Sequence, residues 1–365
     1  MCVCLLLSGL VGAVGAKAAG GDSVVTYEMI RVDPGSFTMC RPPLNGHKPH
    51  EVTLSKAYEL GRTEVTQGQW KAVMGMNPVE VEAAHLNALY GKEPAGSFGT
   101  MDLKKAKASV GDQLPVAYVS WCDSLVFANR LSEAQGLEPV YRYPAAVYWT
   151  PDTVGNVVKG GLVERRGIDR RECAALSARV EVNPSANGYR LPTEAEWRYA
   201  AVSRGQDDYP TKRKDWATAA CTLGNVATRS SAAYHEFKAA QRTDFTCNDD
   251  FPLLAAVGSF PANRLGFRDM IGNVSEWVWD RYLYHAETPT TDPVGPDRGN
   301  HARTLPPDET GRLQYEDDRM QVGGSFDDWW IGKDTTFLHP DVRTTWGYPA
   351  HSALDVGLRL AKNAP

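Results

Sequence analysis

The chain has 365 residues, 42% of them hydrophobic, and its 39 basic and 44 acidic residues leave a net charge of -5. This length is enough for one large domain or two ordinary ones with a sizeable core. The slight acidic excess and the absence of a long Lys/Arg run argue against nucleic-acid binding. Beyond the N-terminus, no stretch of the sequence is apolar enough to span a bilayer.

The N-terminal segment is almost entirely apolar or small, and it ends in small residues around Ala16 and Ala18. This pattern is typical of a signal peptide with a cleavage site, so we predict a signal segment at residues 1–18. The protein is then exported to the periplasm, the cell envelope or the exterior. Cys2 and Cys4 lie in this segment and could carry a lipid anchor, which is the only membrane attachment that we expect. The alternative is a buried N-terminal strand.

Five cysteines follow this segment at irregular spacing: Cys40, Cys122, Cys173, Cys221 and Cys247. Their odd number gives no disulfide framework, although an exported protein allows one or two bridges. None of them belongs to a C-x-x-C pair, so nothing supports a structural zinc site.

Short strands and capped helices are expected along the first half of the chain. Residues 28–32 and 51–54 have the composition of strands on either side of a loop. A helix then begins after Thr66, which has Gln69 three residues on and so forms a capping box. A second helix is expected from Ser120 to Gly136, because its apolar residues recur at helical spacing.

The second half contains long irregular stretches. Residues 139–183 lack periodicity and carry a charged run, so we predict an insertion or an extended surface loop there. Thr193 and Glu196 form another capping box and start a helix after a proline stop. A polar, proline-rich stretch runs through residues 288–318. Such loops are expected where a compact scaffold binds ions or ligands.

Residues 187–197 and 269–277 each combine turn residues, carboxylates and a tryptophan, and they belong to a set of motifs that occur in a specific order. The motifs are residues 34–39, 64–67, 115–121, 187–197, 257–263, 269–277, 323–326 and 357–360. This ordered set resembles the formylglycine-generating enzymes, also called the sulfatase-modifying factor family, from about Glu28 to Lys362. The resemblance implies one loop-rich α+β domain over residues 24–365, with C-type-lectin-like topology.

Two oxygen-rich loops are candidates for structural calcium, which takes six to eight oxygen ligands. By the resemblance, the ligands are Asp269, Gly272, Val274 and Glu276 in one loop, and Asn225, Val226, Asp249 and Phe251 in a second, looser set. Val226, Phe251, Gly272 and Val274 would contribute backbone carbonyls. The alternative is that Asp269 and Glu276 merely cap a turn and a helix.

Formylglycine-generating enzymes bind copper(I) through two cysteines after a Gly-Gly-Ser motif, and soft thiolates suit that metal. By register with the family, Asp328 and Lys333 stand in those two positions here. No cysteine follows Cys247, so we expect no copper. A cysteine oxidase that uses Cys221 and Cys247 instead would require these two thiols to meet.

The segment 326–348 is dense in aromatic and polar residues, a composition typical of recognition surfaces. The predicted ligand-binding residues are Asp328, Trp329, Trp330, Lys333, His339, Arg343 and Trp346; the alternative for the tryptophans is the core. We favour a non-catalytic binding or accessory protein that presents this segment to a protein, peptide or glycan. The alternative is an enzyme of altered chemistry, acting on a peptide or a small molecule, with acid–base groups in the same pocket.

Overall fold

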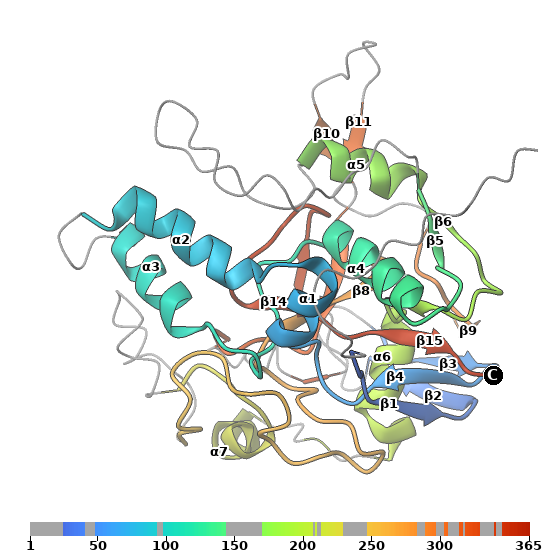
Figure 1. Ribbon diagram of the computed structural model, residues 1–365. Coiled ribbons are helices and arrows are strands. Elements are labelled where there is room, and N and C mark those ends of the chain that lie inside the picture. The colour runs from blue at the N-terminus through green and yellow to red at the C-terminus, as the bar shows by residue number, and fades with distance from the viewer. Residues whose placement is uncertain are drawn as a thin grey trace, which may run out of the picture.

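The fold is organised around two four-stranded sheets, called the central sheets below; in Figure 1 one lies near the middle and the other lies at the right, beside the C-terminus. The structure is a computed structural model, and its described part comprises residues 25–40, 48–92, 98–143, 170–206, 209, 213–228, 247–282, 289–296, 303–305, 314–316, 318–328, 339–340 and 345–365. The predicted signal segment, residues 1–18, lies outside these ranges. So does the middle of the predicted insertion at 139–183.

The first sheet brings both ends of the described chain together. Its strands are β1 (Met29–Val32), β4 (Tyr58–Gly61), β15 (Ala361–Asn363) and β7 (Tyr189–Arg190), in that order and all antiparallel. Because β15 pairs with both β4 and β7, the C-terminal strand closes the sheet between segments that are far apart in sequence.

The second sheet is built around β8 (Ser275–Arg281), a strand that is buried along most of its length. The sheet has the order β13 (Thr345–Gly347), β12 (Arg319–Val322), β8 and β14 (Val356–Leu358). β14 runs parallel to β8, whereas β12 is antiparallel to both β8 and β13. This sheet therefore fixes the chain on both sides of the 326–348 segment.

Three smaller sheets complete the strand structure. They are β2 (Gly35–Met39) with β3 (His50–Leu54) and β9 (Thr290–Thr291), β5 (Tyr141–Arg142) with β6 (Glu181–Val182), and β10 (Arg303–Leu305) with β11 (Gln314–Glu316). The strands predicted at 28–32 and 51–54 are confirmed within a residue, as β1 and β3.

Helices pack around the sheets, and capping boxes start three of them, at the two predicted positions, Thr66 and Thr193, and also at Ser120. The helices are α1 (Gln67–Met74), α2 (Pro78–Tyr90), α3 (Phe98–Ala108), α4 (Trp121–Ala134), α5 (Arg170–Arg179), α6 (Glu194–Ala201) and α7 (Arg213–Leu223), with a 3-10 turn at Ser203–Gly205. Thr66, Ser120 and Thr193 each accept a hydrogen bond from the third residue of the helix they cap, as expected for a capping box. Gly136 follows α4 with a φ of 69°, the left-handed conformation that ends helices.

Four helices, α2, α3, α5 and α7, lie where the sequence patterns predicted none. α2 and α3 pack against each other at one edge of the molecule (Figure 1). α5 lies within the predicted insertion, and a disulfide between Cys122 and Cys173 joins it to α4. That part of the insertion is therefore an ordered helix, in contrast to the loop that its lack of periodicity suggested. No helix in the described ranges is long and apolar enough to cross a membrane.

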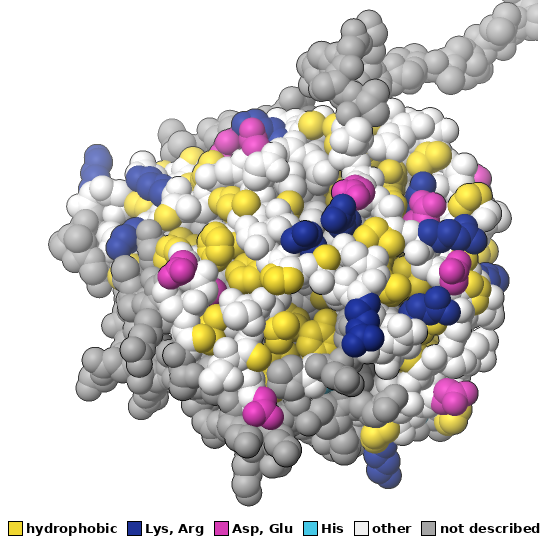
Figure 2. Space-filling model, turned by 90° about the horizontal axis from the view of Figure 1, so that it is seen from below, with side chains coloured by type: hydrophobic (Ala, Val, Ile, Leu, Met, Phe, Trp, Pro, Cys, Tyr) yellow, Lys and Arg dark blue, Asp and Glu magenta, His cyan; other side chains and the backbone are white. Residues whose placement is uncertain are grey.

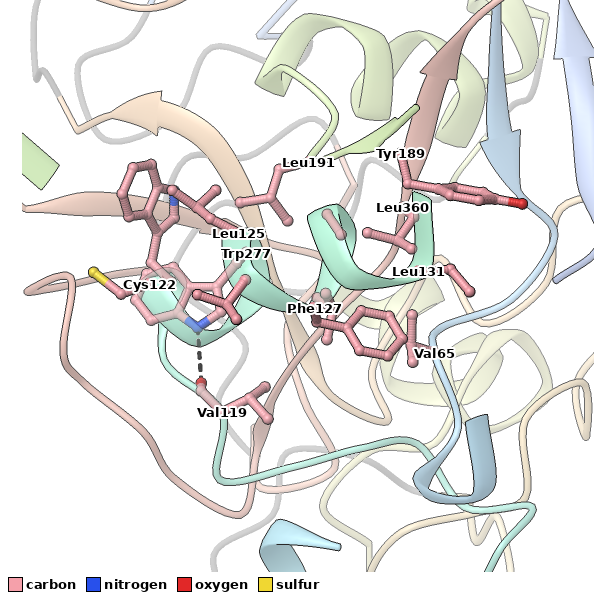
Figure 3. Close-up of a cluster of buried hydrophobic side chains, with 14 of the residues drawn as sticks. Val65, Val119, Cys122, Leu125, Phe127, Leu131, Tyr189, Leu191, Trp277 and Leu360 are labelled. Atoms are coloured by element: carbon pink, nitrogen blue, oxygen red, sulfur yellow. Dashed lines mark hydrogen bonds between the residues drawn. The ribbon is translucent and has the colours of Figure 1, made fainter. Parts of the chain in front are cut away.

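The largest hydrophobic cluster surrounds α4 (Figure 3). Leu125, Phe127 and Leu131 of this helix are buried against residues from both central sheets. Trp277 of β8 is fully buried there and donates its indole N–H to the carbonyl oxygen of Val119 at 3.0 Å. Because a buried indole N–H needs an acceptor, this bond fixes the start of α4 against β8.

Candidate functional site

A buried ion pair holds the start of β8. Glu276 is 1% exposed, and the Nη2 and Nε of Arg359 donate to its carboxylate at 2.7 to 3.1 Å. Trp197 of α6 donates its indole N–H to the same carboxylate at 2.5 Å. Burial alone would lower the pKa of Arg359, but the charge of Glu276 raises it, so the guanidinium stays protonated.

The remaining donors of Arg359 bind backbone oxygens. Nη1 donates to Gly61 at 3.0 Å, and Nη2 donates to Arg268 at 2.9 Å and Asp269 at 3.3 Å. One guanidinium thereby connects β4, the 269–276 loop and β8. Both oxygens of Glu276 accept hydrogen bonds in this arrangement, and its predicted role as a calcium ligand stays a prediction.

A second pair of carboxyl groups lies beside this ion pair. Glu64 is 0% exposed and accepts a hydrogen bond from Asn273 at 3.0 Å, while Asp269 accepts from the backbone N–H of Gly258. Burial and the nearby charge of Asp269 raise the pKa of Glu64 well above its usual range. Burial likewise raises the pKa of Asp269, against the opposing effects of its hydrogen bond from Gly258 and of Arg359.

The second predicted calcium set is assembled around Asp249. Its carboxylate accepts from the backbone N–H groups of Val226 at 2.8 Å and Phe251 at 3.1 Å, and from the hydroxyl of Thr228 at 2.9 Å. Asn225 is fully buried and donates to the carbonyl oxygen of Leu253 at 2.7 Å. The loop segments that hold these residues meet as the family resemblance implied.

The side-chain oxygen of Asn225 has no hydrogen-bond partner in the described structure, although it is buried. A buried acceptor without a donor costs free energy, and a cation would satisfy it. A neighbouring carboxylate and backbone carbonyls are the donor set that calcium prefers. The side chains of Asn225 and Asp249 are therefore compatible with calcium, and the carbonyl contributions of Val226 and Phe251 stay predictions.

The two predicted sets lie side by side. Gly272 forms an isolated bridge with Asn225, and a Cβ atom on Gly272 would lie only 1.9 Å from the carbonyl oxygen of Asn225. Gly272 also has a φ of 71°, which favours glycine. The 269–276 loop thus acts as a support for Asn225.

The loop after the Gly-Gly-Ser motif contains Asp328, the residue that the sequence register predicts at the position of the first family cysteine. Asp328 accepts hydrogen bonds from the backbone N–H of Ser325 at 2.6 Å and from its hydroxyl at 3.1 Å. Burial raises the pKa of Asp328 to about 6, with smaller contributions from Asp355 and Asp327. A hard oxygen donor that closes a turn does not fit copper(I).

Most of the predicted ligand-binding residues lie outside the described part of the chain: Trp329, Trp330, Lys333 and Arg343. Trp346 belongs to β13, where it pairs in register with Met320 of β12. These placements leave the predicted recognition role of the segment as a prediction.

His339 is packed among aromatic side chains. It is 5% exposed, and its ring lies 5.8 Å from that of Tyr209 and 6.0 Å from that of Trp216, both in edge-on geometry. Burial, with a smaller effect of Arg198, lowers the pKa of His339 to about 4. His339 contacts these aromatic rings, whereas Asp328 binds Ser325, so these contacts do not join the two residues in one acid–base group.

Cys221 and Cys247 meet in the structure, but as a disulfide with a Cα–Cα distance of 5.9 Å. Their sulfurs are therefore not a pair of thiolates. Cys40 is the remaining described cysteine; it is buried and belongs to neither of these disulfides.

A cavity of about 310 Å³ opens beside the 269–276 loop. Its walls are formed by Tyr209, Leu223, residues 261–264, Phe267 and residues 269–271. Among the described residues of the 326–348 segment, none belongs to these walls.

Sequence reasoning missed the partners of the buried carboxylates. Glu64 and Arg359 belong to motifs that carried the family resemblance, and Trp197 ends another. A buried carboxylate needs a cation or a hydrogen-bond donor nearby. Arg359 and Trp197 in these motifs could therefore have been proposed as partners of Glu276. The spacing of these residues along the chain does not specify which carboxylate meets which donor.

The buried ion pair predicts a large loss of stability when one partner is removed. Arg359→Met leaves Glu276 charged and buried, and we expect the free energy of unfolding to fall by about 3–5 kcal/mol in urea titrations. Arg62→Met is the matched control, because Arg62 pairs with Glu28 at 2.8 Å on the surface. That variant should lose at most about 1 kcal/mol. Equal losses in the two variants would contradict this assignment.

The buried imidazole predicts an acid-sensitive fold. Because the pKa of His339 is lowered to about 4 in the folded chain, folding favours the neutral ring. The stabilisation is present above the unfolded pKa of about 6.5 and is lost as the pH falls towards 4. Thermal unfolding between pH 7 and 4 should therefore show a steeper decline for the wild type than for His339→Gln. Parallel declines would show that other groups cause the acid sensitivity.

Comparison with known proteins identifies a family model and relatives that are similar to this chain. Residues 17–364 match the family model of the sulfatase-modifying factor enzyme 1-like domain. The chain is 28% identical over 291 residues to the chaperone protein LppX of Paenibacillus barcinonensis, covering 78% of this chain and 82% of that protein. It is 27% identical over 246 residues to the formylglycine-generating enzyme of Mus musculus, covering 66% of this chain and 57% of that enzyme.

Among solved structures, Treponema denticola variable protein 1 has a similar fold. The two structures superpose with a TM-score of 0.60 at 24% identity, over 93% of this chain and 95% of that chain. At this identity the similarity concerns the fold alone.

Proposed function

The chain belongs to the sulfatase-modifying factor family, and from that premise we propose that it is an exported, non-catalytic binding or accessory protein. A calcium-stabilised scaffold presents the segment 326–348 to a protein, peptide or glycan. The observation that carries this proposal is the role of Asp328. This residue stands where the family's copper chemistry needs a cysteine, and it closes a turn through Ser325.

The positions of the cysteines in the sequence also support the loss of the copper chemistry. No cysteine follows Cys247, and Cys247 itself is bonded to Cys221. An enzyme of altered chemistry would need Asp328, Lys333 and His339 to converge. The packing of His339 against Tyr209 and Trp216 gives no support to that alternative.

A relative that matches most of this chain supports an accessory role. LppX of Paenibacillus barcinonensis is named a chaperone protein, and the match spans 82% of its length. Export is supported by the two disulfides, Cys122–Cys173 and Cys221–Cys247, because such bonds persist in oxidising compartments. The apolar N-terminal segment of the sequence supports the same location.

The surface that is visible from below carries charges of both signs among scattered hydrophobic side chains (Figure 2). On the described part of this face, no broad basic region stands out, and the whole chain has a net charge of -5. Proteins that bind nucleic acid usually concentrate Lys and Arg on one face. These features support a partner other than nucleic acid.

The calcium part of the proposal concerns the Asn225 set. Calcium should raise the thermal stability of EDTA-treated protein, because an ion that binds only the folded chain stabilises it by mass action. Asn225→Leu should lose this response. Asn129→Leu is the matched control, because Asn129 is also buried and bonded to backbone, through Tyr141. An undiminished calcium response in Asn225→Leu would contradict the assignment.

The recognition part is tested with a double variant, Trp329→Ala with Trp330→Ala. The wild type should capture a partner from the exported fraction. The captured partner is identified, and its affinity for the wild type is then measured by titration. We expect the double variant to lose at least about tenfold in affinity, since aromatic anchors dominate such surfaces. Val294→Ala changes an exposed side chain elsewhere and serves as control. Equal affinities for all three proteins would refute the role of this segment.

A further inference from the structure

The candidate calcium site is divided between two segments of the chain. Asn225 follows the end of α7, whereas Asp249 lies on a later loop. A disulfide joins the two segments close to both ligands. Cys221 is in the last turn of α7 shortly before Asn225, and Cys247 shortly precedes Asp249. The covalent link is thus placed at the base of the site.

The Asn225 half has supports of its own. Its backbone carbonyl accepts from the N–H of Asn273 at 2.8 Å, and its side-chain N–H donates to the side-chain oxygen of Asn273 at 3.0 Å. It also donates to the carbonyl oxygen of Leu253 and forms the bridge with Gly272. The position of Asn225 therefore does not depend on the disulfide.

Hydrogen bonds hold the Asp249 half to the Asn225 half, among them one from Thr228 to the side-chain oxygen of Asn248 at 2.9 Å. The carboxylate of Asp249 reaches that segment through Val226 and Thr228, while its bond to Phe251 is local. Individual hydrogen bonds contribute little net free energy, so these contacts can open. A covalent link near these contacts limits how far the two segments separate when the hydrogen bonds break. It therefore keeps each half of the site at a high effective concentration relative to the other.

We propose that the Cys221–Cys247 disulfide completes the cation site by holding Asp249 against Asn225, so that full calcium affinity is reached only after this bond has formed. The inference rests on the proposed calcium site. Cys221 and Cys247 are positioning residues here and do not touch the ion. Since disulfides form in oxidising compartments, the site matures after export.

The second disulfide provides a matched control. Cys122 and Cys173 are both 0% exposed, and their bond joins α4 to α5 within the largest hydrophobic cluster. Cys221 belongs instead to a separate small cluster with Trp216 and Ile271. Removal of either bond lowers the stability of the fold, but only removal of Cys221–Cys247 acts on the cation site.

The test is a calorimetric titration of the EDTA-treated full chain with calcium chloride. The double variant Cys221→Ala with Cys247→Ala should bind calcium at least about tenfold more weakly than the wild type, a loss typical of a forfeited intramolecular link. The variant Cys122→Ala with Cys173→Ala should keep the wild-type affinity. Circular dichroism checks that each variant is folded. Wild-type affinity in the first variant overturns the inference and leaves the proposed calcium site intact.

A variant that fails to fold is replaced by reduction of the wild type. A mild thiol reductant converts the disulfide to two thiols while two reductant thiols are oxidised to a disulfide. Cys247 is partly exposed, so its bond is reduced before the buried Cys122–Cys173 bond. Calcium affinity should fall on reduction and return on reoxidation, whereas an unchanged affinity contradicts the inference. If the wild type binds no calcium in either the oxidised or the reduced state, the proposed calcium site itself is wrong.

Discussion

The structure depends on one buried guanidinium. Arg359 follows β14 and precedes β15, and it binds Glu276 of β8 and the backbone oxygens of Gly61, Arg268 and Asp269. A buried charge is tolerated only when it is paired and its donors are satisfied, so these contacts form together or not at all. They join the two central sheets to each other. The fold contains many short strands and long loops, and this residue connects the parts that hydrogen-bond ladders alone would leave separate.

The same contacts position the surfaces that we assign to function. They fix the 269–276 loop, from which Gly272 and Asn273 support Asn225. The backbone carbonyl of Asn273 also accepts from the N–H of Phe326 at 3.0 Å, at the start of the ligand segment. Ala227, which follows the candidate calcium ligands, donates to the carbonyl oxygen of Asp328 at 3.2 Å. The cation site and the base of the ligand segment therefore share one support, and stabilising the first holds the second in place.

Much of this architecture could be predicted from sequence, because its signals are local or belong to an ordered set of motifs. The capping boxes at Thr66, Ser120 and Thr193 start helices as expected, and the α+β fold of the formylglycine-generating enzyme family is confirmed. α5 was missed because its burial depends on tertiary packing and a disulfide, not on a clear apolar stripe. The predicted ligand role of Glu276 did not account for Arg359, which is distant in sequence. Long-range pairing of buried charges leaves no periodic signal, so it could not be derived from spacing.

The central claim is that the family's copper-dependent oxidation of a cysteine has been lost, leaving a recognition scaffold. The most direct measurement incubates the purified chain with copper(I), oxygen and a reductant, in the presence of a cysteine peptide that serves as substrate for a formylglycine-generating enzyme. Mass spectrometry then reports whether the cysteine has been converted to formylglycine, with an active enzyme of that family as positive control. The account predicts an unchanged peptide, because Asp328 supplies an oxygen where a thiolate is needed. Catalytic formation of formylglycine by this chain would contradict it.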